Sequence, residues 1–400
     1  MVEAAFAAAI LRKTARAARW PGWGVAIYST LAAGTLTGRL AFAANASATH
    51  ATESRLVVVL LRGALDGLAA VPAVGDPAWT DLRGQSDAAA KLAPPLRLDG
   101  MFAMHPALAN LHRWYTEKDL LVVHATASAY RERSHFDAQQ LLESGGDRPF
   151  ALQTGWLGRA LESSHQNAMA LTAAMPLALR GGAAASTWTP ERRGTNDRDL
   201  MERVAQMYAT DPALQTAFSH ALGQQEMAMG AEGGTGFNQL AKQAGVFLSD
   251  PTGPRVAWLE AGGWDTHTQQ TPRLQRLLSS LDDGLAALRT ALGANWAKTT
   301  VLVITEFGRS AHYNGTGGTD HGTGSVAFVA GGAVAGGRVQ TDWPGLATAS
   351  LLDKRDLKPT LDLRALIAPA LQRQFGLGNA QMQTQIFPGM TDRPLQLWRA

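Results

Sequence analysis

Carboxylate and imidazole side chains recur beside apolar runs at several points of the sequence, and these are residue types that bind divalent cations. Asp265 and His267 stand two residues apart in a loop flanked by glycine. Asp320 and His321 are adjacent in a second glycine-rich loop. A single such pair is more typical of a turn or an ordinary hydrogen bond, but several together predict a metal site. The candidate ligands are Asp66, Asp265, His267, Glu306, Asp320 and His321.

Ser134 stands where a predicted loop meets a predicted helix, with Asp137 three residues later. This pattern is typical of a helix N-cap. The same position suits a nucleophile, because the free N–H groups and positive potential of a helix N-terminus favour a serine alkoxide. Both interpretations stay open. Arg133 and Arg309 are candidates to neutralise the oxygens of a phosphate or sulfate group.

The elements that must position these residues alternate in type after residue 54. Apolar, β-branched runs predict strands buried on both faces, and helical stretches separate them. The predicted strands are 56–61, 120–124, 168–173, 256–259, 301–305 and 326–330, and the predicted helices are 106–117, 134–144, 153–163, 269–292 and 362–374. This order predicts an α/β fold with a doubly wound, largely parallel sheet flanked by helices. Ligands of such sheets bind at the carboxyl ends of the strands, where we expect the candidate residues to meet.

Two further histidines are expected to support this site without binding the cation directly. His124 ends a predicted central strand and points toward the same edge of the sheet. His135 directly follows Ser134. Side chains in such places commonly orient the ligands of a metal.

The segment 180–250 interrupts the alternation of strands and helices. It is rich in glycine and alanine at first, then polar and helical, with no convincing strand. We expect a helical insertion over one edge of the sheet, acting as a cap or lid or forming a plain surface excursion. The remainder of 54–390 is expected to form a single domain.

Composition excludes several classes of protein. The 400 residues are 46% hydrophobic and 17% charged, which is too apolar for disorder and long enough for a large core. There is no cysteine, so disulfides, thiolate metal sites and cysteine nucleophiles are excluded. The net charge is +3, but five basic residues and one acid lie in 1–43, so the remainder carries −1. A nucleic-acid partner is therefore not expected.

The first 43 residues have the pattern of an export signal. A basic stretch, 12–19, precedes an uncharged run, 20–38, and small residues at 41–43 provide a cleavage site. The mild hydrophobicity suits twin-arginine translocation, although Arg12-Lys13 is the nearest approach to adjacent arginines, and it is weak for a permanent membrane span. We expect a cleaved signal peptide and a periplasmic or secreted protein. A retained anchor or a plain N-terminal extension is the alternative.

Five segments, in this order, resemble a family of exported bacterial proteins, the domain of unknown function 1501. Phe387-Pro388-Gly389 fits the same pattern, and the resemblance covers about residues 54–390. It implies the fold of the alkaline phosphatase and sulfatase superfamily, with a metal site at the carboxyl edge of the sheet. The five segments are Arg62–Gly67, Tyr130–Gln139, Gly262–His267, Thr305–Arg309 and Gly317–Gly322.

The resemblance also implies roles for individual residues. It implies Ser134 as the nucleophile and Asp66, with the loop histidines, as metal ligands. Where that superfamily usually has Asp-His, this chain has Glu306-Phe307, which keeps an oxygen donor and lacks the imidazole. The number of ions therefore stays open. The absence of cysteine excludes the cysteine-derived formylglycine of typical sulfatases.

Two functions are consistent with the sequence. The first is an exported hydrolase of phosphate or sulfate esters that depends on Zn²⁺, Mn²⁺, Ca²⁺ or Mg²⁺, with an anionic ester or a sulfated or phosphorylated glycan as substrate. The alternative is a non-catalytic exported protein that keeps the fold to bind a metal, a glycan or a protein, which Glu306-Phe307 favours. An oxidoreductase is not supported, because no glycine fingerprint follows the strand 56–61. The substrate and the oligomeric state are not predicted.

Overall fold

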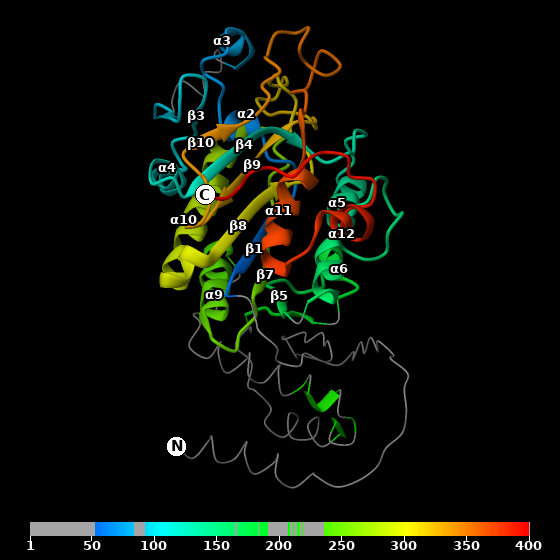
Figure 1. The fold of residues 1–400 in the computed structure, drawn as a ribbon. Helices are drawn as coiled ribbons and strands as arrows, with labels where there is room; N and C mark the ends of the chain where they lie inside the picture. The colour runs from blue at the N-terminus through cyan, green and yellow to red at the C-terminus, as the bar shows by residue number, and fades with distance from the viewer. Residues whose placement is uncertain are drawn as a thin grey trace.

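The computed structural model of the chain describes residues 53–83, 93–164, 166–182, 184–190, 207–208, 211, 214–216, 218 and 236–399. A sheet of nine strands runs through these residues, and helices cover both of its faces (Figure 1). A second sheet pairs two short strands.

β1 (Arg55–Leu61) lies inside the large sheet, between β8 (Thr299–Thr305) and β7 (Val256–Ala261), and its seven residues are all buried. It is parallel to both of these strands. Beyond β7 the sheet continues with β5 (Ala168–Ala170) and β6 (Ala185–Thr187), both parallel. The carboxyl ends of these strands therefore lie at one edge.

The other half of the sheet contains the antiparallel strand. β9 (Ser325–Ala330) lies between β8 and β4 (Leu120–Ala127) and is antiparallel to both. β10 (Arg338–Gln340) and β11 (Leu361–Asp362) pair with β4 in parallel. Because β9 runs in reverse, the loop 306–324 leaves β8 and enters β9 at the same edge of the sheet.

One helical layer packs against the face of β1 that carries Val57 and Val59. It contains α4 (Ala109–Thr116), α9 (Phe237–Ser249) and α10 (Gln270–Leu292), and their buried apolar residues form one cluster with the strand. Burial of each Val or Leu side chain contributes about 1.5–3 kcal/mol, so this layer fixes the position of the sheet.

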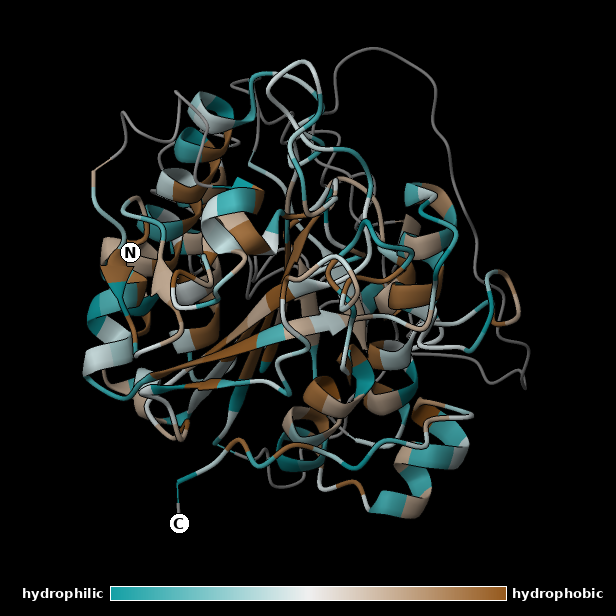
Figure 2. Cartoon of the chain, turned by 90° about the horizontal axis from the view of Figure 1, so that it is seen from above, coloured by the Kyte–Doolittle hydropathy of each residue, from teal (hydrophilic) through white to brown (hydrophobic). Residues whose placement is uncertain are grey.

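The opposite layer packs against Leu56 and Val58 of β1. It contains α5 (His135–Ser144), α6 (Trp156–Glu162) and α11 (Leu363–Phe375). Figure 2 shows the apolar strands enclosed between the two helical layers. The shorter elements are α2 (Gly67–Ala70), α3 (Trp79–Arg83), β2 (Leu96–Arg97), β3 (Ala103–Met104), η2 (Leu177–Leu179), η3 (Gly293–Lys298), α12 (Asn379–Gln381) and η4 (Met382–Ile386).

The predicted fold is confirmed as a doubly wound, largely parallel α/β sheet flanked by helices, and each predicted strand and helix is present with shifted ends. The prediction that 180–250 contains no strand is wrong at 185–187, where β6 extends the sheet. The segment also ends in α9, which packs against α10 as part of a main layer. Most of the rest of that segment, and the predicted export signal 1–43, lie outside the described residues.

No helix in the part of the chain that the structure describes is long and apolar enough to cross a membrane.

Candidate functional site

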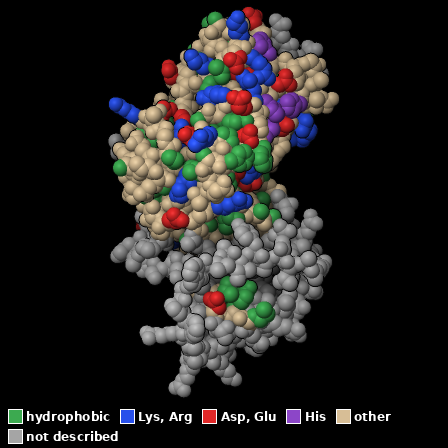
Figure 3. Space-filling model, turned by 90° about the vertical axis from the view of Figure 1, so that its right-hand side faces the viewer, with side chains coloured by type: hydrophobic (Ala, Val, Ile, Leu, Met, Phe, Trp, Pro, Cys, Tyr) green, Lys and Arg blue, Asp and Glu red, His purple; other side chains and the backbone are tan. Residues whose placement is uncertain are grey.

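Four loops meet at the carboxyl edge of the sheet. They follow β1, β4, β7 and β8 and span 62–66, 128–134, 262–269 and 306–324. Histidine side chains gather on one face of the molecule, close to acidic and basic side chains (Figure 3). The loops therefore bring together the residue types that the sequence singled out.

Three side-chain atoms form a small triangle, one from the first residue of α5 and two from the loops 262–269 and 306–324. Nε2 of His135 lies 3.1 Å from Nε2 of His321. Oδ1 of Asp265 lies 3.5 Å from the first of these nitrogens and 3.3 Å from the second. Ligand atoms bound at roughly 2.0–2.2 Å to a tetrahedral cation are roughly 3.3–3.6 Å apart. The triangle therefore has the size of one face of a metal-coordination shell.

The second nitrogen of each ring is held by a hydrogen-bond acceptor. Nδ1 of His135 lies 2.8 Å from Oε1 of Glu306, and Nδ1 of His321 lies 2.9 Å from the backbone carbonyl of Arg133. A carboxylate and a carbonyl only accept, so each Nδ1 carries the hydrogen. Both Nε2 lone pairs then face the space beside Asp265. Such a group of electron-rich atoms calls for a metal cation or an added proton.

The surrounding charges decide which ring would hold that proton. Burial lowers the pKa of His321. Burial also opposes protonation of His135, but the hydrogen bond and charge of Glu306, together with Asp265, outweigh burial and raise the pKa of His135. Without a cation, an added proton is therefore favoured on His135 over His321. A bound cation would replace this proton.

Glu306 is fully buried and orients His135. Although burial raises the pKa of a carboxyl group, the hydrogen bonds from His135 and Gln139 hold the pKa of Glu306 below its usual value. Both of its oxygens accept hydrogen bonds, so the structure gives this residue an orienting role where the sequence predicted a ligand. Its donors are Gly63 N–H at 2.8 Å, His135 Nδ1 at 2.8 Å, Gln139 Nε2 at 2.9 Å and Thr305 Oγ1 at 3.0 Å.

His267 repeats this arrangement beside the triangle. Its Nε2 lies 3.0 Å from Oδ1 of Asp265, and its Nδ1 lies 3.3 Å from Oδ1 of Asp320. Asn314 also donates to Asp320, at 3.1 Å. His267 therefore shares Oδ1 of Asp265 with the triangle, and Asp320 is placed to orient its ring.

Arg309 is buried and holds Asp265 in place. Its Nη1 donates to Oδ1 of Asp265 at 2.5 Å, and its remaining groups donate to the hydroxyl and carbonyl of Thr319. Burial raises the pKa of Asp265, but the ion pair with Arg309, together with the nearby His267 and His135, outweighs this and lowers it. The guanidinium of Arg309 thus has its partners within the protein, whereas the sequence predicted a contact with substrate.

Arg133 is likewise engaged within the protein. Its guanidinium forms ion pairs with Asp356 at 2.8 Å and Asp353 at 2.9 Å. Its backbone has φ of 61°, a left-handed conformation that directs the carbonyl to His321. Strained residues of this kind persist where surrounding contacts fix them. In the structure, the backbone of Arg133 therefore holds the ring of His321.

Asp66 lies outside the triangle. It caps α2 by accepting from Ala69 N–H, pairs with Arg83 at 2.8 Å, and accepts from Gln270 Nε2 at 2.6 Å. Gln270 in turn accepts from the hydroxyl of Thr319, a partner of Arg309. The carboxylate of Asp66 is thus saturated by hydrogen bonds and supports the site from outside.

His124 contacts other residues than those of the triangle. Its Nε2 lies 2.9 Å from the carbonyl of Val71, and its ring stacks on Phe102 and meets the edge of Trp343. Full burial lowers the pKa of His124 to about 4. The predicted ligand-orienting role is not seen among these contacts.

Ser134 caps α5, because its Oγ accepts from the backbone N–H of Asp137 at 3.4 Å. The predicted N-cap is confirmed. The residue also stands between Arg133, whose carbonyl binds His321, and His135 of the triangle. Its hydroxyl is therefore held at the helix N-terminus that begins with His135.

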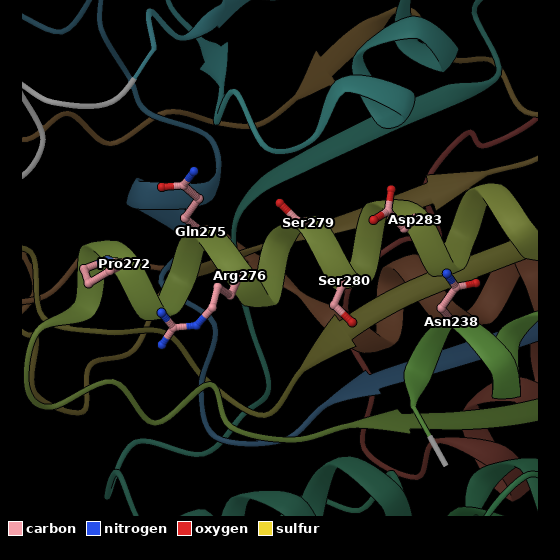
Figure 4. Close-up of a pocket in the computed structure, with 7 residues that line it drawn as sticks. All are labelled: Asn238, Pro272, Gln275, Arg276, Ser279, Ser280 and Asp283. Carbon is pink, nitrogen blue, oxygen red and sulfur yellow. The ribbon is translucent and has the colours of Figure 1, made fainter. Parts of the chain in front are cut away.

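An open groove of about 570 Å³ lies elsewhere, along α10 (Figure 4). Its lining has no imidazole, and the labelled side chains point to different sides of the helix. We assign no chemistry to it. The lining residues are Asn238, Pro272, Gln275, Arg276, Ser279, Ser280 and Asp283.

Two residues that shape the site were not predicted from the sequence. Gln139 lies four residues after His135 on α5, and this spacing places both on one helix face, which is a usable signal. Asp356 binds Arg133 across more than two hundred residues and has no local signal.

The model of a family described as protein of unknown function, DUF1501, matches residues 133–387. The chain belongs to the DUF1501 family. The matched region of this DUF1501 protein includes His135, Asp265 and His321, which form the triangle. No curated protein matches it.

Several solved structures are similar to this DUF1501 protein. A protein in the alkaline phosphatase superfamily from Vibrio parahaemolyticus shares 13% identity over 75% of this chain and 64% of its own, with a TM-score of 0.37. A phosphonate monoester hydrolase of Agrobacterium radiobacter shares 10% identity over 69% of this chain and 67% of its own, with a TM-score of 0.35. A putative sulfatase from Bacteroides thetaiotaomicron shares 10% identity over 86% of this chain and 76% of its own, with a TM-score of 0.41. The chain spans about two thirds of the first two. Identities and TM-scores this low assign no activity to it.

Proposed function

We propose that this DUF1501 protein is a metal-dependent hydrolase of phosphate or sulfate esters. The observation that supports this most is the convergence of His135 Nε2, His321 Nε2 and Asp265 Oδ1 at the carboxyl edge of the sheet. Two neutral imidazoles and one carboxylate suit Zn²⁺ or Mn²⁺ better than Ca²⁺ or Mg²⁺, which prefer oxygen ligands.

The residues present fit such a cation. His135, His321 and Asp265 would hold it, with His267 as the candidate fourth ligand. When bound, the ion would supply a Lewis acid for an oxygen of the ester. The chain prepares the site, because Glu306 keeps the hydrogen of His135 on Nδ1 and leaves its Nε2 free.

Ser134 is the proposed nucleophile. The N-terminus of α5 supplies free N–H groups and positive potential, which favour its alkoxide. Attack by Oγ on the phosphorus or sulfur would form an ester to Ser134 and release the alcohol of the substrate. Water would then hydrolyse that ester and regenerate the hydroxyl. The support for this role is the place of Ser134 between two residues that build the triangle.

We further propose that the protein is exported and acts in the periplasm or outside the cell. The predicted signal peptide of residues 1–43 supports this location. An anionic ester, such as a phosphorylated or sulfated glycan, is the proposed substrate class. The net charge of −1 beyond the leader gives no support to a nucleic-acid substrate.

The first test is the metal content of protein purified without chelators, measured by elemental analysis. We expect a bound divalent metal in the wild type and its loss in His321→Ala. His112→Ala is the matched control, because His112 lies on α4 and contacts the carbonyl of Arg97. Absence of metal after incubation with Zn²⁺ and Mn²⁺ would contradict the proposal.

The second test is hydrolysis of a panel of phosphate and sulfate esters with the metal that the first test identifies. We expect turnover that falls with the metal content of His321→Ala. Bound metal without turnover of any ester would favour the alternative, an exported protein that binds its ligand without catalysis.

A further inference from the structure

Two exposed phenylalanines lie against each other at the end of α5 that begins with His135. Phe136 directly follows His135 on α5, and its side chain is 73% exposed. Phe150, in the loop between α5 and α6, is 48% exposed. Their ring centroids are 5.5 Å apart. Among the described residues, the other large hydrophobic side chains with this degree of exposure are Met207 and Val246.

The structure holds Phe150 in this exposed place. Gln140 of α5 accepts the backbone N–H of Phe150 at 2.6 Å and donates to the carbonyl of Leu152 at 3.1 Å. Phe150 also has φ of 61°, a left-handed conformation that is costly for a bulky residue. A strained backbone that keeps an apolar ring in solvent is unfavourable for folding alone, so it points to a ligand.

The place of the pair identifies the part of a ligand that it would meet. The Cα atoms of consecutive residues are about 3.8 Å apart, so Phe136 starts next to His135 of the triangle. The polar triangle suits the anionic group of an ester, and the organic group of that ester must project away from it. At this end of α5 the two phenylalanines offer it an apolar, aromatic surface.

We propose that Phe136 and Phe150 bind the organic group of the substrate and select esters whose alcohol is aromatic or has another flat apolar face. This inference rests on the proposed function, because it takes the anionic group of the ester to lie at the triangle. Offset aromatic rings attract one another beyond their area burial, so each phenylalanine contributes severalfold to affinity.

The test compares two ligands that share one anionic group. Calorimetric titration measures the binding of 1-naphthyl phosphate and of ethyl phosphate to the metal-loaded protein, with the corresponding sulfates in parallel. Every protein in this comparison, including the one called wild type, also carries Ser134→Ala, which removes the proposed nucleophile so that the esters bind without being hydrolysed. We expect the naphthyl ester to bind about tenfold more tightly than the ethyl ester in the wild type. In Phe136→Ala and in Phe150→Ala this preference falls severalfold, and in the double variant it disappears, while the affinity for the ethyl ester stays unchanged.

Val246→Ala is the matched control, because Val246 is an exposed hydrophobic residue on α9. It keeps the preference of the wild type. Equal affinity of the wild type for the naphthyl and ethyl esters would overturn this inference and leave the proposed function standing. A naphthyl preference that both phenylalanine variants keep would do the same. No binding of any ester or of inorganic phosphate to the wild type would overturn the proposed function as well.

Sedimentation velocity of the same variants separates a ligand site from a contact between copies of the chain. An unchanged sedimentation coefficient in Phe136→Ala supports the ligand site. Dissociation of an oligomer in that variant would show that the pair is a protein interface and would overturn the inference.

Discussion

Nε2 of His135 and Nε2 of His321 face each other at 3.1 Å, although the partners of both rings place the hydrogen on Nδ1. Two lone pairs at this distance repel each other unless a positive charge lies beside them. Oδ1 of Asp265, within 3.5 Å of both nitrogens, adds a third electron-rich atom. This relationship makes the edge of the sheet a place where a cation is expected.

Glu306→Gln tests whether the partner of His135 controls metal affinity. The amide has the shape of the carboxyl group but lacks its charge. Its NH₂ group would also face N–H or O–H groups that donate hydrogen bonds to Glu306 in the wild type. We expect the metal affinity to fall about 10- to 100-fold, as for other residues that orient a histidine ligand. Competition with a chelating dye measures it.

Glu260→Gln is the control for this change, because Glu260 lies on β7 and its carboxylate pairs with Arg62. It should leave metal affinity unchanged. Equal affinities for Glu306→Gln and the wild type would show that Glu306 does not orient the site.

The sequence allowed the fold and part of the site to be predicted for a clear physical reason. A strand buried on both faces, such as β1, must be apolar throughout, so it is visible without any alignment. Asp265 and His321 were expected at the carboxyl edge because they flank such strands. The reverse direction of β9 was not predicted, since local pattern carries no strand direction.

The roles of other site residues depended on contacts far along the chain. Glu306 was predicted as a ligand, but one of its oxygens accepts a hydrogen bond from His135, which is 171 positions away in the chain. Arg133 was predicted to meet substrate, but Asp353 and Asp356 bind its guanidinium from 220 and 223 positions away. Charged groups find their partners in three dimensions, and sequence spacing does not reveal these pairs.

Asp356→Ala tests the support behind Arg133. Asp356 is fully buried and accepts from Arg133 at 2.8 Å and from Thr323 at 2.9 Å. Removal of this carboxylate leaves its donors without a partner, so we expect the free energy of unfolding to fall by about 3 kcal/mol. Urea denaturation measures the loss.

Asp353→Ala is the comparison for Asp356→Ala, because the side chain of Asp353 is 66% exposed and pairs with the same arginine. A solvent-exposed ion pair contributes about 0–1 kcal/mol, so the cost should be small. Equal losses for the two variants would contradict the difference in burial.

Because His124 is buried in its neutral form, we predict that the protein loses stability in mild acid. Burial lowers the pKa of this residue from 6.5 to about 4, so the folded state stays neutral where the unfolded state binds a proton. Stability should therefore fall as the pH drops through 6.5 toward 4, by about 2 kcal/mol at pH 5 relative to pH 7.5. His105, whose pKa burial also lowers to about 4, adds to the effect.

Urea denaturation at pH 7.5 and pH 5 measures this dependence. His124→Gln should be less stable than the wild type at both values, because it loses the ring contacts with Phe102 and Trp343. Its loss between the two pH values should be smaller. An equal loss in both proteins would assign the acid sensitivity to other groups.

Two substitutions of Ser134 test whether this residue is a nucleophile or only a helix cap. Glycine replaces serine at an N-cap at a cost of only a few tenths of a kcal/mol, whereas alanine costs about 1 kcal/mol. Ser134→Gly therefore removes the hydroxyl and nearly keeps the stability of α5. We expect it to lose ester hydrolysis as completely as Ser134→Ala, by a factor of about 10³ or more in kcat, because no alkoxide remains.

Metal content and thermal unfolding complete the comparison of the Ser134 variants. Both should keep the metal, since Ser134 is not among the three atoms of the triangle. Ser134→Ala should melt at a lower temperature than Ser134→Gly. If Ser134→Gly retains the activity of the wild type while Ser134→Ala loses stability, the serine serves as a cap alone, and attack on the ester then falls to water.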